Sequence, residues 1–301
     1  MQLIKKTHID FIGKRKISFI ISGIIAIVGI VGMIQVSRGA ANMGIDFTGG
    51  TALQLKFAKP VAIDKARSAL LKNGLEPNLQ EIKDGNKLLV KIGKANLALG
   101  KVAGTVEEIF KKEFPDNAFV VESSTEIGPS IGEKLRKDTL IAITIAMLGI
   151  ILYIAWRFDF KFGVSAAVAT LHDVLAMFAV FYVLNMEIDL LFITAVLTIA
   201  GYSLTDTVVV FDRIRENLHK NQKESLHSIF NQSLNEVLSR TIITSLTTFL
   251  AAISLYLFGG EVIHNFAFAL VTGVVVATYS SIFVASPVAL VWENRAKHSA
   301  V

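Results

Sequence analysis

Long apolar runs alternate with shorter polar connections along most of the chain. A membrane-spanning helix needs about 20 mostly apolar residues to cross about 30 Å of hydrocarbon. Six runs qualify, at residues 17–36, 139–156, 163–184, 190–211, 239–258 and 266–291. Because 52% of the residues are hydrophobic and only 18% are charged, the pattern predicts an α-helical polytopic membrane protein with six transmembrane helices.

The polar stretch between the first two runs, residues 37–138, is long enough to form one small domain. Its periodicity predicts a strand at 51–57, a helix at 62–75, a hairpin over 78–93, a helix at 96–114 and a strand at 117–125. Asp84-Gly85 stands between the two alternating runs of the hairpin, as a tight turn requires. The order β-α-β-β-α-β predicts an α+β domain of the ferredoxin-like type.

We therefore expect three parts: an N-terminus with the first helix at 1–36, the α+β domain at 37–138, and five helices with the C-terminus at 139–301. The loops at 185–189 and 258–265 contain no Lys or Arg, whereas the loops on the other side carry them. Short loops rich in Lys and Arg face the cytoplasm, so both termini should be cytoplasmic and 37–138 periplasmic or extracellular. The length of the first run and the lack of a cleavage site after it predict a retained signal anchor.

The net charge of +5 follows from this bias, because an anionic inner leaflet attracts basic loops. The charge therefore implies a lipid bilayer and no nucleic acid. The chain has no cysteine, which excludes thiol chemistry and disulfides. The polar stretch 212–238 is amphipathic and predicts a helix lying on the inner membrane surface or, equally, a solvated connecting helix. Loop charges such as Glu187 and Asp189 are expected to be solvated.

Two opposite charges, Asp206 and Arg240, lie within otherwise apolar stretches. A charge at the membrane centre costs about 2.5–3.5 kcal/mol on insertion scales, so such residues usually pair or line a hydrated path. Both should lie within about 10 Å of the same interface, given a rise of 1.5 Å per residue. We expect Asp206 to carry a proton and Arg240 to be its counter-charge; a static ion pair, or an arginine that reaches to the interface, is the structural alternative.

A second candidate is His172-Asp173, near the middle of the third run. A carboxylate beside an imidazole suits a proton relay, and a polar contact between helices explains it equally well. In the sixth run, small residues recur every fourth position and predict a close-packing face. These residues are Gly273, Ala277, Ser281 and Ala285.

Motifs for soluble enzyme chemistry are missing from the sequence. There is no GxxxxGK[ST] phosphate loop and no HExxH metal spacing. Neither Asp206 nor Asp173 lies in the GxGD context that resembles intramembrane aspartyl proteases. We therefore expect no enzyme activity, no metal site and no cofactor.

Four motifs together carry a family resemblance: GIDFTGG at 44–50, GPSIG at 128–132, LHD at 171–173 and YSLTDTVVVFDRIRE at 202–216. With one span before the polar domain and five after it, the chain resembles the SecF branch of the SecD/SecF protein-export membrane proteins, within the resistance-nodulation-division (RND) superfamily. The resemblance covers essentially the whole chain.

The resemblance implies a half-transporter that pairs with SecD, associates with the SecYEG channel and uses the proton motive force to draw an unfolded polypeptide outward. It implies functional roles for Asp206 and Arg240, and a less defined one for His172-Asp173. The outer domain would be tethered by hinge and coupling residues, which are Gly44, Asp46, Gly49, Gly50, Gly128 and Pro129. A tight turn that merely starts the domain is the alternative for the glycines.

The proton is the expected coupling ion, although the residues do not exclude sodium. Two other functions remain open: an RND-type exporter of small molecules or lipids, and a scaffold of the translocon that transports nothing. An intramembrane protease, which the missing GxGD context disfavours, comes last and would require a cleaved substrate.

Overall fold

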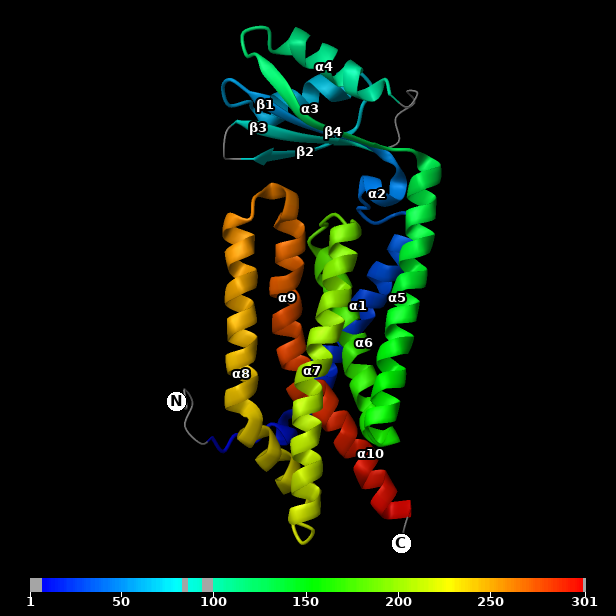
Figure 1. The fold of residues 1–301 in the computed structure, drawn as a ribbon, viewed down its shortest axis with the longest axis vertical. Helices are drawn as coiled ribbons and strands as arrows, with labels where there is room; N and C mark the ends of the chain where they lie inside the picture. Colours follow the sequence, from blue (N-terminus) through cyan, green and yellow to red (C-terminus); the bar gives the residue numbers. More distant parts are fainter. Residues whose placement is uncertain (1–6, 83–85, 94–99, 300–301) are drawn as a thin grey trace.

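The computed structural model describes residues 7–82, 86–93 and 100–299. Within them, six helices are long and apolar enough to cross a membrane, which confirms the six predicted spans. They form an elongated bundle with a small α+β domain at one end (Figure 1). The spans are α1 (Arg15–Ser37, preceded by a 3₁₀ turn at Ile12–Lys14), α5 (Pro129–Arg157), α6 (Phe160–Val183), α7 (Leu190–Lys220), α8 (Leu226–Phe258) and α9 (His264–Ser280) continued by α10 (Ser286–Ser299).

The α+β domain, which we call the outer domain after the side of the membrane expected for it, is a four-stranded sheet with two helices on one face. Its elements are β1 (Gly50–Phe57), α3 (Ile63–Lys72), β2 (Pro77–Ile82), β3 (Lys87–Ile92), α4 (Val102–Glu113) and β4 (Phe119–Ile127). The strand order is β2-β3-β1-β4 and all neighbours are antiparallel. This is the predicted ferredoxin-like order. The turn at Asp84-Gly85 and the predicted helix start at 96–99 lie outside the described residues.

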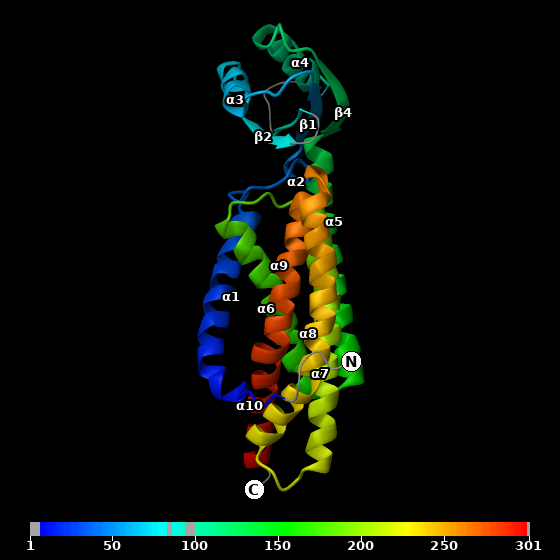
Figure 2. The ribbon, with the colours of Figure 1, turned by 90° about the vertical axis from the view of Figure 1, so that its left-hand side faces the viewer.

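Strict alternation along the strands explains why the helices cover only one face. In β3, Leu88, Val90 and Ile92 are buried beneath α3 and α4, while Lys87 and Lys91 point to the opposite face. That opposite face is turned toward the helix bundle (Figures 1 and 2). The sheet therefore presents charged side chains to the outer ends of the membrane helices.

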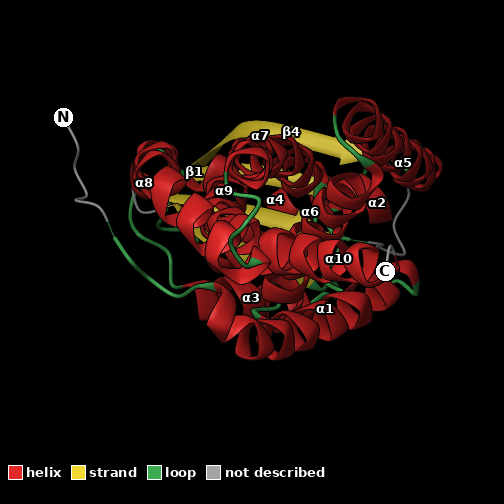
Figure 3. Cartoon of the chain, turned by 90° about the horizontal axis from the view of Figure 1, so that it is seen from below, coloured by secondary structure: helices red, strands yellow, loops and turns green. Residues whose placement is uncertain are grey.

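The bundle has an inner and an outer set of helices. α6, α7 and α9 carry most of the buried side chains, whereas α5 and α8 bury little. Viewed from below, α5, α7 and α8 lie along one side of the bundle (Figure 3). One long side of the molecule is therefore apolar, helical and only partly covered by the rest of the chain.

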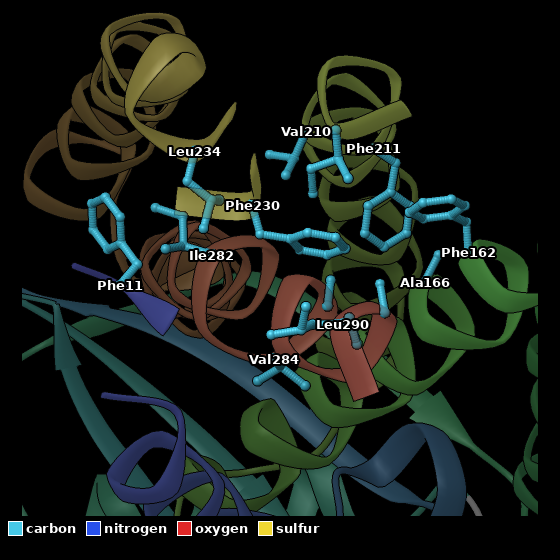
Figure 4. Packing of buried hydrophobic residues seen from close by; sticks show 14 of the residues in the cluster. Phe11, Phe162, Ala166, Val210, Phe211, Phe230, Leu234, Ile282, Val284 and Leu290 are labelled. Carbon is cyan, nitrogen blue, oxygen red and sulfur yellow. The ribbon is translucent and has the colours of Figure 1, made fainter. Parts of the chain in front are cut away.

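Neither of the two predictions for 212–238, a helix on the membrane surface or a solvated connecting helix, is correct. α7 continues to Lys220 and α8 starts at Leu226, so this stretch consists of the ends of two long spans that meet in a hairpin (Figure 1). Its apolar residues pack against other helices: Phe230 and Leu234 join Phe11 and Phe211 in one cluster (Figure 4). Burial between helices removes the apolar stripe from water as effectively as a membrane surface would.

The last span is interrupted by one π-helical turn at Ser281–Ala285, between α9 and α10. Ser286 Oγ donates to Ser281 O at 3.0 Å, and Pro287, which lacks an N–H, follows. The helix changes direction here (Figure 1), at the kind of irregularity that often marks functional positions.

Candidate ion-coupling site

Asp206 lies on the inner side of α7, where it is 8% exposed. Its carboxylate is next to the hydroxyls of Thr241 on α8 and Ser281 in the π turn. Even so, Asp206 Oδ2 and Thr241 Oγ1 have no hydrogen-bond partner among the residues that the structure describes. A buried carboxylate oxygen normally has a hydrogen-bond partner, so Asp206 is the less satisfied of the buried aspartates and the stronger candidate for a functional role.

Arg240 does not form the predicted ion pair. Within the described part of the chain, no pair of 4.0 Å or less joins it to Asp206, and its side chain is exposed. Successive helix residues point about 100° apart, so when Thr241 faces Asp206, Arg240 faces outward. Asp206 and Arg240 lie at a similar depth along the bundle axis, but Asp206 faces the bundle interior and Arg240 faces outward. Sequence spacing predicts the depth of a helix residue but not which neighbouring helix its face meets.

Several hydroxyl-bearing side chains of α7 and α8 also face outward. Thr198, Gly201 and Thr205 of α7 are exposed, away from the face of the helix that buries Asp206. Thr244 and Thr247 of α8 lie on the exposed side together with Arg240. The exposed face of α7 and α8 therefore carries a cation and several hydroxyls in an otherwise apolar surface.

Asp173 is fully buried and joins three helices. Its Oδ2 accepts from Ser203 on α7 at 2.5 Å and from Ser280 on α9 at 2.9 Å. Its Oδ1 lies 3.2 Å from Nδ1 of His172. Both oxygens are satisfied, so the contacts of Asp173 are those of a polar tie between α6, α7 and α9.

His172 leads from this tie to α1. Its Nε2 has no partner in the described part of the protein, and its ring lies beside Tyr279, with centroids 6.2 Å apart. The Tyr279 hydroxyl is 3.1 Å from Ser22 Oγ. Polar groups of α6, α9 and α1 thus lie near one another at this level of the bundle, with a ring contact between His172 and Tyr279.

Three serines lie between the two aspartates, and sequence reasoning missed them. Ser203, which bonds Asp173, precedes Asp206 by one turn on α7, and Ser280, which also bonds Asp173, is followed by Ser281 beside Asp206. The sequence offered one signal for this contact: Ser203 lies three residues before Asp206 and therefore near the same face of α7. The two carboxylates therefore belong to one connected polar region.

The stripe of small residues on the last span packs closely against α7, as the spacing predicted. Gly273, Ala277, Ser281 and Ala285 are all buried. A Cβ added to Gly273 would lie 2.5 Å from a side-chain carbon of Ile199. α9 and α7 thus approach more closely here than any larger residue would allow.

The motif at 44–50 forms a short helix, α2 (Ile45–Thr48), capped by Gly44. Gly49 and Gly50 follow with φ of +73° and +147°, which residues with a Cβ rarely adopt. They turn the chain from α2 into β1. Asp46 Oδ2 accepts from the backbone N of Leu190, at 3.1 Å.

The second hinge motif lies against the first. Gly128 caps α5 and Pro129 is its first residue, a position where the missing N–H costs nothing. A Cβ on Gly49 would lie 3.0 Å from Pro129. The structure thus brings together the entry and the exit of the outer domain.

Glu187 and Asp189 are not the solvated loop charges that we expected. Glu187 is 5% exposed and accepts from Lys91 Nζ of β3 at 2.7 Å. Asp189 caps α7 by accepting from the backbone N of Phe192, at 2.8 Å. Burial raises the pKa of Asp189, and the nearby charge of Glu187 raises it further, against the Phe192 N–H and the charge of Lys91.

Metal-ligand geometry is not found in the described part of the chain, where no group of three or more His, Cys, Asp or Glu side chains is arranged so that it could hold a metal ion. What the arrangement offers chemically is a buried carboxylate with an unpartnered oxygen, a buried polar tie and a charged junction to the outer domain.

Comparison with known proteins gives the family. Residues 105–295 match the C-terminal family of the SecD/SecF protein-export membrane proteins, and residues 41–61 match the SecD/SecF GG motif. The protein translocase subunit SecF of Thermodesulfovibrio yellowstonii is 50% identical over 293 residues, which cover 96% of both chains. That of Calditerrivibrio nitroreducens is 41% identical over 95% of both.

Among solved structures, the crystal structure of SecDF, a translocon-associated membrane protein from Thermus thermophilus, matches 98% of this chain with a TM-score of 0.84 and 34% identity. SecDF in its Super-membrane-facing form matches with a TM-score of 0.72 and 33% identity. The chain spans 40% of the length of either SecDF chain. The six spans, the outer domain with its glycine motif and these matches agree: the chain belongs to the SecF family of bacterial multi-pass membrane proteins.

Proposed function

We propose that this chain is the SecF half of a proton-driven complex that helps the Sec translocon export unfolded polypeptides across the bacterial cytoplasmic membrane. The observation that carries the proposal is Asp206, a buried carboxylate within a membrane helix with one unpartnered oxygen among the described residues. An ionisable side chain at membrane depth costs free energy, so such residues are rare and usually mark an ion or substrate path. The relatives are named protein translocase subunits, which supports polypeptide export as the process served.

The exposed face of α5, α7 and α8 is where we place the partner half, SecD. Arg240 lies on this face, and a guanidinium is poorly tolerated against lipid. A SecD chain would cover it and supply a matching carboxylate. The greater length of the SecDF chains, of which this chain spans 40%, supports a second half of similar architecture. SecYEG would be the channel served.

Proton entry then has a direct effect on three helices. A proton that reaches Asp206 from outside, along the interface with SecD, would neutralise it and weaken its attraction to Arg240. Its contacts with Thr241 and Ser281 would change at the same time, and Ser281 starts the π turn of the last span. Each proton crossing supplies about 2.3 kcal/mol per 100 mV, so a few per cycle could bias a sliding chain outward.

The outer domain would move with the helices and hold the emerging polypeptide. The packed glycine motifs at 44–50 and 128–132 would be its hinges. The two SecDF structures have nearly equal identity to this chain but TM-scores of 0.84 and 0.72, which supports a fold with more than one arrangement. In this scheme both termini are cytoplasmic; the described chain ends lie at the end of the bundle opposite the domain (Figure 1).

The coupling ion is the proton in this proposal, with sodium as the alternative, and the chain carries out no enzymatic step or cofactor chemistry of its own. Cavities of about 950, 480 and 330 Å³ are lined by residues at the cytoplasmic end of the helices. They do not favour a small-molecule exporter, which we would expect to bind its cargo in the outer domain.

The test is export of a secretory protein into inverted vesicles that contain the channel and both halves, with and without an imposed proton gradient. Asp206→Asn and Arg240→Met should assemble normally and lose only the gradient-dependent part of export. Replacing the proton gradient with a sodium gradient separates the two ions. A scaffold would tolerate both substitutions, so full gradient stimulation in Asp206→Asn would refute the proposal.

A further inference from the structure

Four charged side chains gather where the outer domain meets the outer end of α7: Asp46, Lys91, Glu187 and Asp189. We call them the outer junction. Lys91 Nζ and Glu187 Oε2 are 2.7 Å apart, and their side chains are 18% and 4% exposed. A pair so well shielded is unlike exposed ion pairs, which contribute little, because removing one partner leaves a buried charge uncompensated.

The ion pair joins two parts that are distant in sequence. Lys91 lies on the face of β3 that is turned away from α3 and α4, toward the bundle (Figure 1). Glu187 lies between α6 and α7. The chain enters the domain from α1 and leaves it into α5, so α7 is not its covalent neighbour. The pair is therefore a direct non-covalent link from the sheet to the start of α7.

Backbone bonds reinforce the link. Gly44 N donates to Ile188 O at 2.9 Å, and Ile188 N donates to Asn42 O at 2.8 Å. Asp46, in the entry motif of the domain, accepts from the first residue of α7, Leu190. The start of α7 is thus held both by the segment that leads into the domain and by the sheet itself.

Steric crowding explains why residue 44 is a glycine. A Cβ there would lie 2.9 Å from Glu187 Oε1 and 3.0 Å from Asp189 Cβ. The absence of a side chain lets the entry segment lie directly against the carboxylate that Lys91 binds. Gly44 and the Lys91–Glu187 ion pair therefore pack directly against each other.

The same helix carries the candidate ion-coupling residue. α7 is one unbroken helix from Leu190 to Lys220, and Asp206 lies about 24 Å from its outer end at 1.5 Å per residue. A rigid helix transmits displacement along its length. Tilting or sliding of α7 at Asp206 therefore also moves the outer junction.

We propose, building on the proposed function, that the outer junction is the link through which α7 passes its movement to the outer domain. Lys91 and Glu187 are the positioning pair of this link and stay in contact throughout the cycle. They carry no proton; they keep the sheet attached to the helix while Asp206 is loaded and released.

The first experiment measures gradient-dependent export in the vesicles described above. Lys91→Met and Glu187→Gln should each reduce that part about fivefold or more, the low end of the coupling between linked sites, and leave gradient-independent export unchanged. Exchanging the charges, Lys91→Glu with Glu187→Lys, should restore a large part. Lys87→Met is the matched control, because it breaks a pair of equal length, 2.7 Å to Glu122, on the same strand but within the domain.

The second experiment replaces the ion pair with a covalent one. The chain has no cysteine, so Lys91→Cys with Glu187→Cys can be joined by a short bis(methanethiosulfonate) crosslinker, which forms reducible disulfides with both thiols, in a complex whose partner subunits also lack cysteine. Bridged complexes should keep gradient-dependent export, and reduction of the same sample should lower it about fivefold or more, as in the single variants.

Two results would overturn the proposal. Loss of gradient-dependent export on bridging would mean that the contact has to open. Wild-type export in both single variants, while Asp206→Asn loses its gradient-dependent part, would leave the proposed function standing and make the junction merely structural. If Asp206→Asn also keeps that part, the proposed function itself has failed.

Discussion

The two aspartates of the membrane bundle lie in connected surroundings but differ in how well they are satisfied. Asp173 is fully buried, and both of its oxygens have partners on α6, α7 or α9. Asp206 is nearly as buried, yet one oxygen has no partner within the described structure, and the neighbouring face of α7 is exposed. Burial alone does not distinguish a structural carboxylate from one that is free to react.

The difference follows from position in the bundle. Asp173 faces the centre, where three helices each place a polar group within reach, so its burial is compensated. Asp206 lies at the edge of the packed region, where this chain supplies only part of a coordination shell. A buried polar group left incomplete is a candidate for function, whereas a complete one rigidifies its surroundings.

The largest expected effect concerns Asp206. Asp206→Asn should abolish the gradient-dependent part of export, because an amide does not take up a proton at physiological pH. The melting temperature of the purified subunit should stay close to wild type, since no satisfied contact is lost. If Asp206→Asn keeps gradient-dependent export but has a clearly lower melting temperature, Asp206 is the structural aspartate and not the proton carrier.

Asp173 should behave in the opposite way. Asp173→Ala leaves the hydroxyl of Ser203 without its acceptor, whereas Ser280 Oγ keeps the backbone oxygen of Ala277; we expect the loss to cost about 1–3 kcal/mol of stability. Unfolding of the purified subunit in detergent measures this loss. Asp173→Asn keeps one acceptor oxygen and should lose less. If Asp173→Ala is as stable as wild type and yet loses gradient-dependent export, Asp173 is a proton carrier and not a tie.

A smaller effect separates the packed face of α7 from the exposed one. Gly273→Ala places a methyl group against Ile199 and should destabilise the isolated subunit by about 1 kcal/mol, the low end for overpacking. Gly201→Ala is the matched control: a Cβ there meets nothing within 4 Å, so replacing a mid-helix glycine should stabilise by about 0.5–1 kcal/mol. Equal effects of the two changes would argue against close packing between α9 and α7.

The smallest effect is one of pH at the outer junction. Because the pKa of Asp189 is raised, its contribution to stability is complete below the ordinary Asp pKa and is lost as pH rises through the raised value. Asp189→Asn keeps the cap of α7 and removes the buried charge. From about pH 4 upward, wild type should therefore lose melting temperature relative to the variant. If the melting temperatures of wild type and Asp189→Asn change in parallel over this pH range, burial does not raise the cost of ionising Asp189.

Much of the architecture could be predicted because it depends on local pattern. Six apolar runs of membrane length gave six helices, and the strand and helix periods between 51 and 125 gave the ferredoxin-like order. The stretch 212–238 was misjudged because an amphipathic stripe has the same pattern whether it faces lipid or another helix. The depth of Arg240 could be estimated from helix rise, but its face could not, because a rotation of one residue exchanges it with Thr241.

The sequence by itself determined the spans, the outer domain, the glycine motifs and the presence of charges at membrane depth, since hydrophobic length and backbone preference act over a few neighbouring residues. Only the tertiary structure decided which polar groups meet. Ser203 and Ser280 reach Asp173 from two other helices, and Lys91 reaches Glu187 from a strand 96 positions away. Such contacts depend on the rotation and tilt of whole helices, which the packing of side chains such as Ile199 against Gly273 sets.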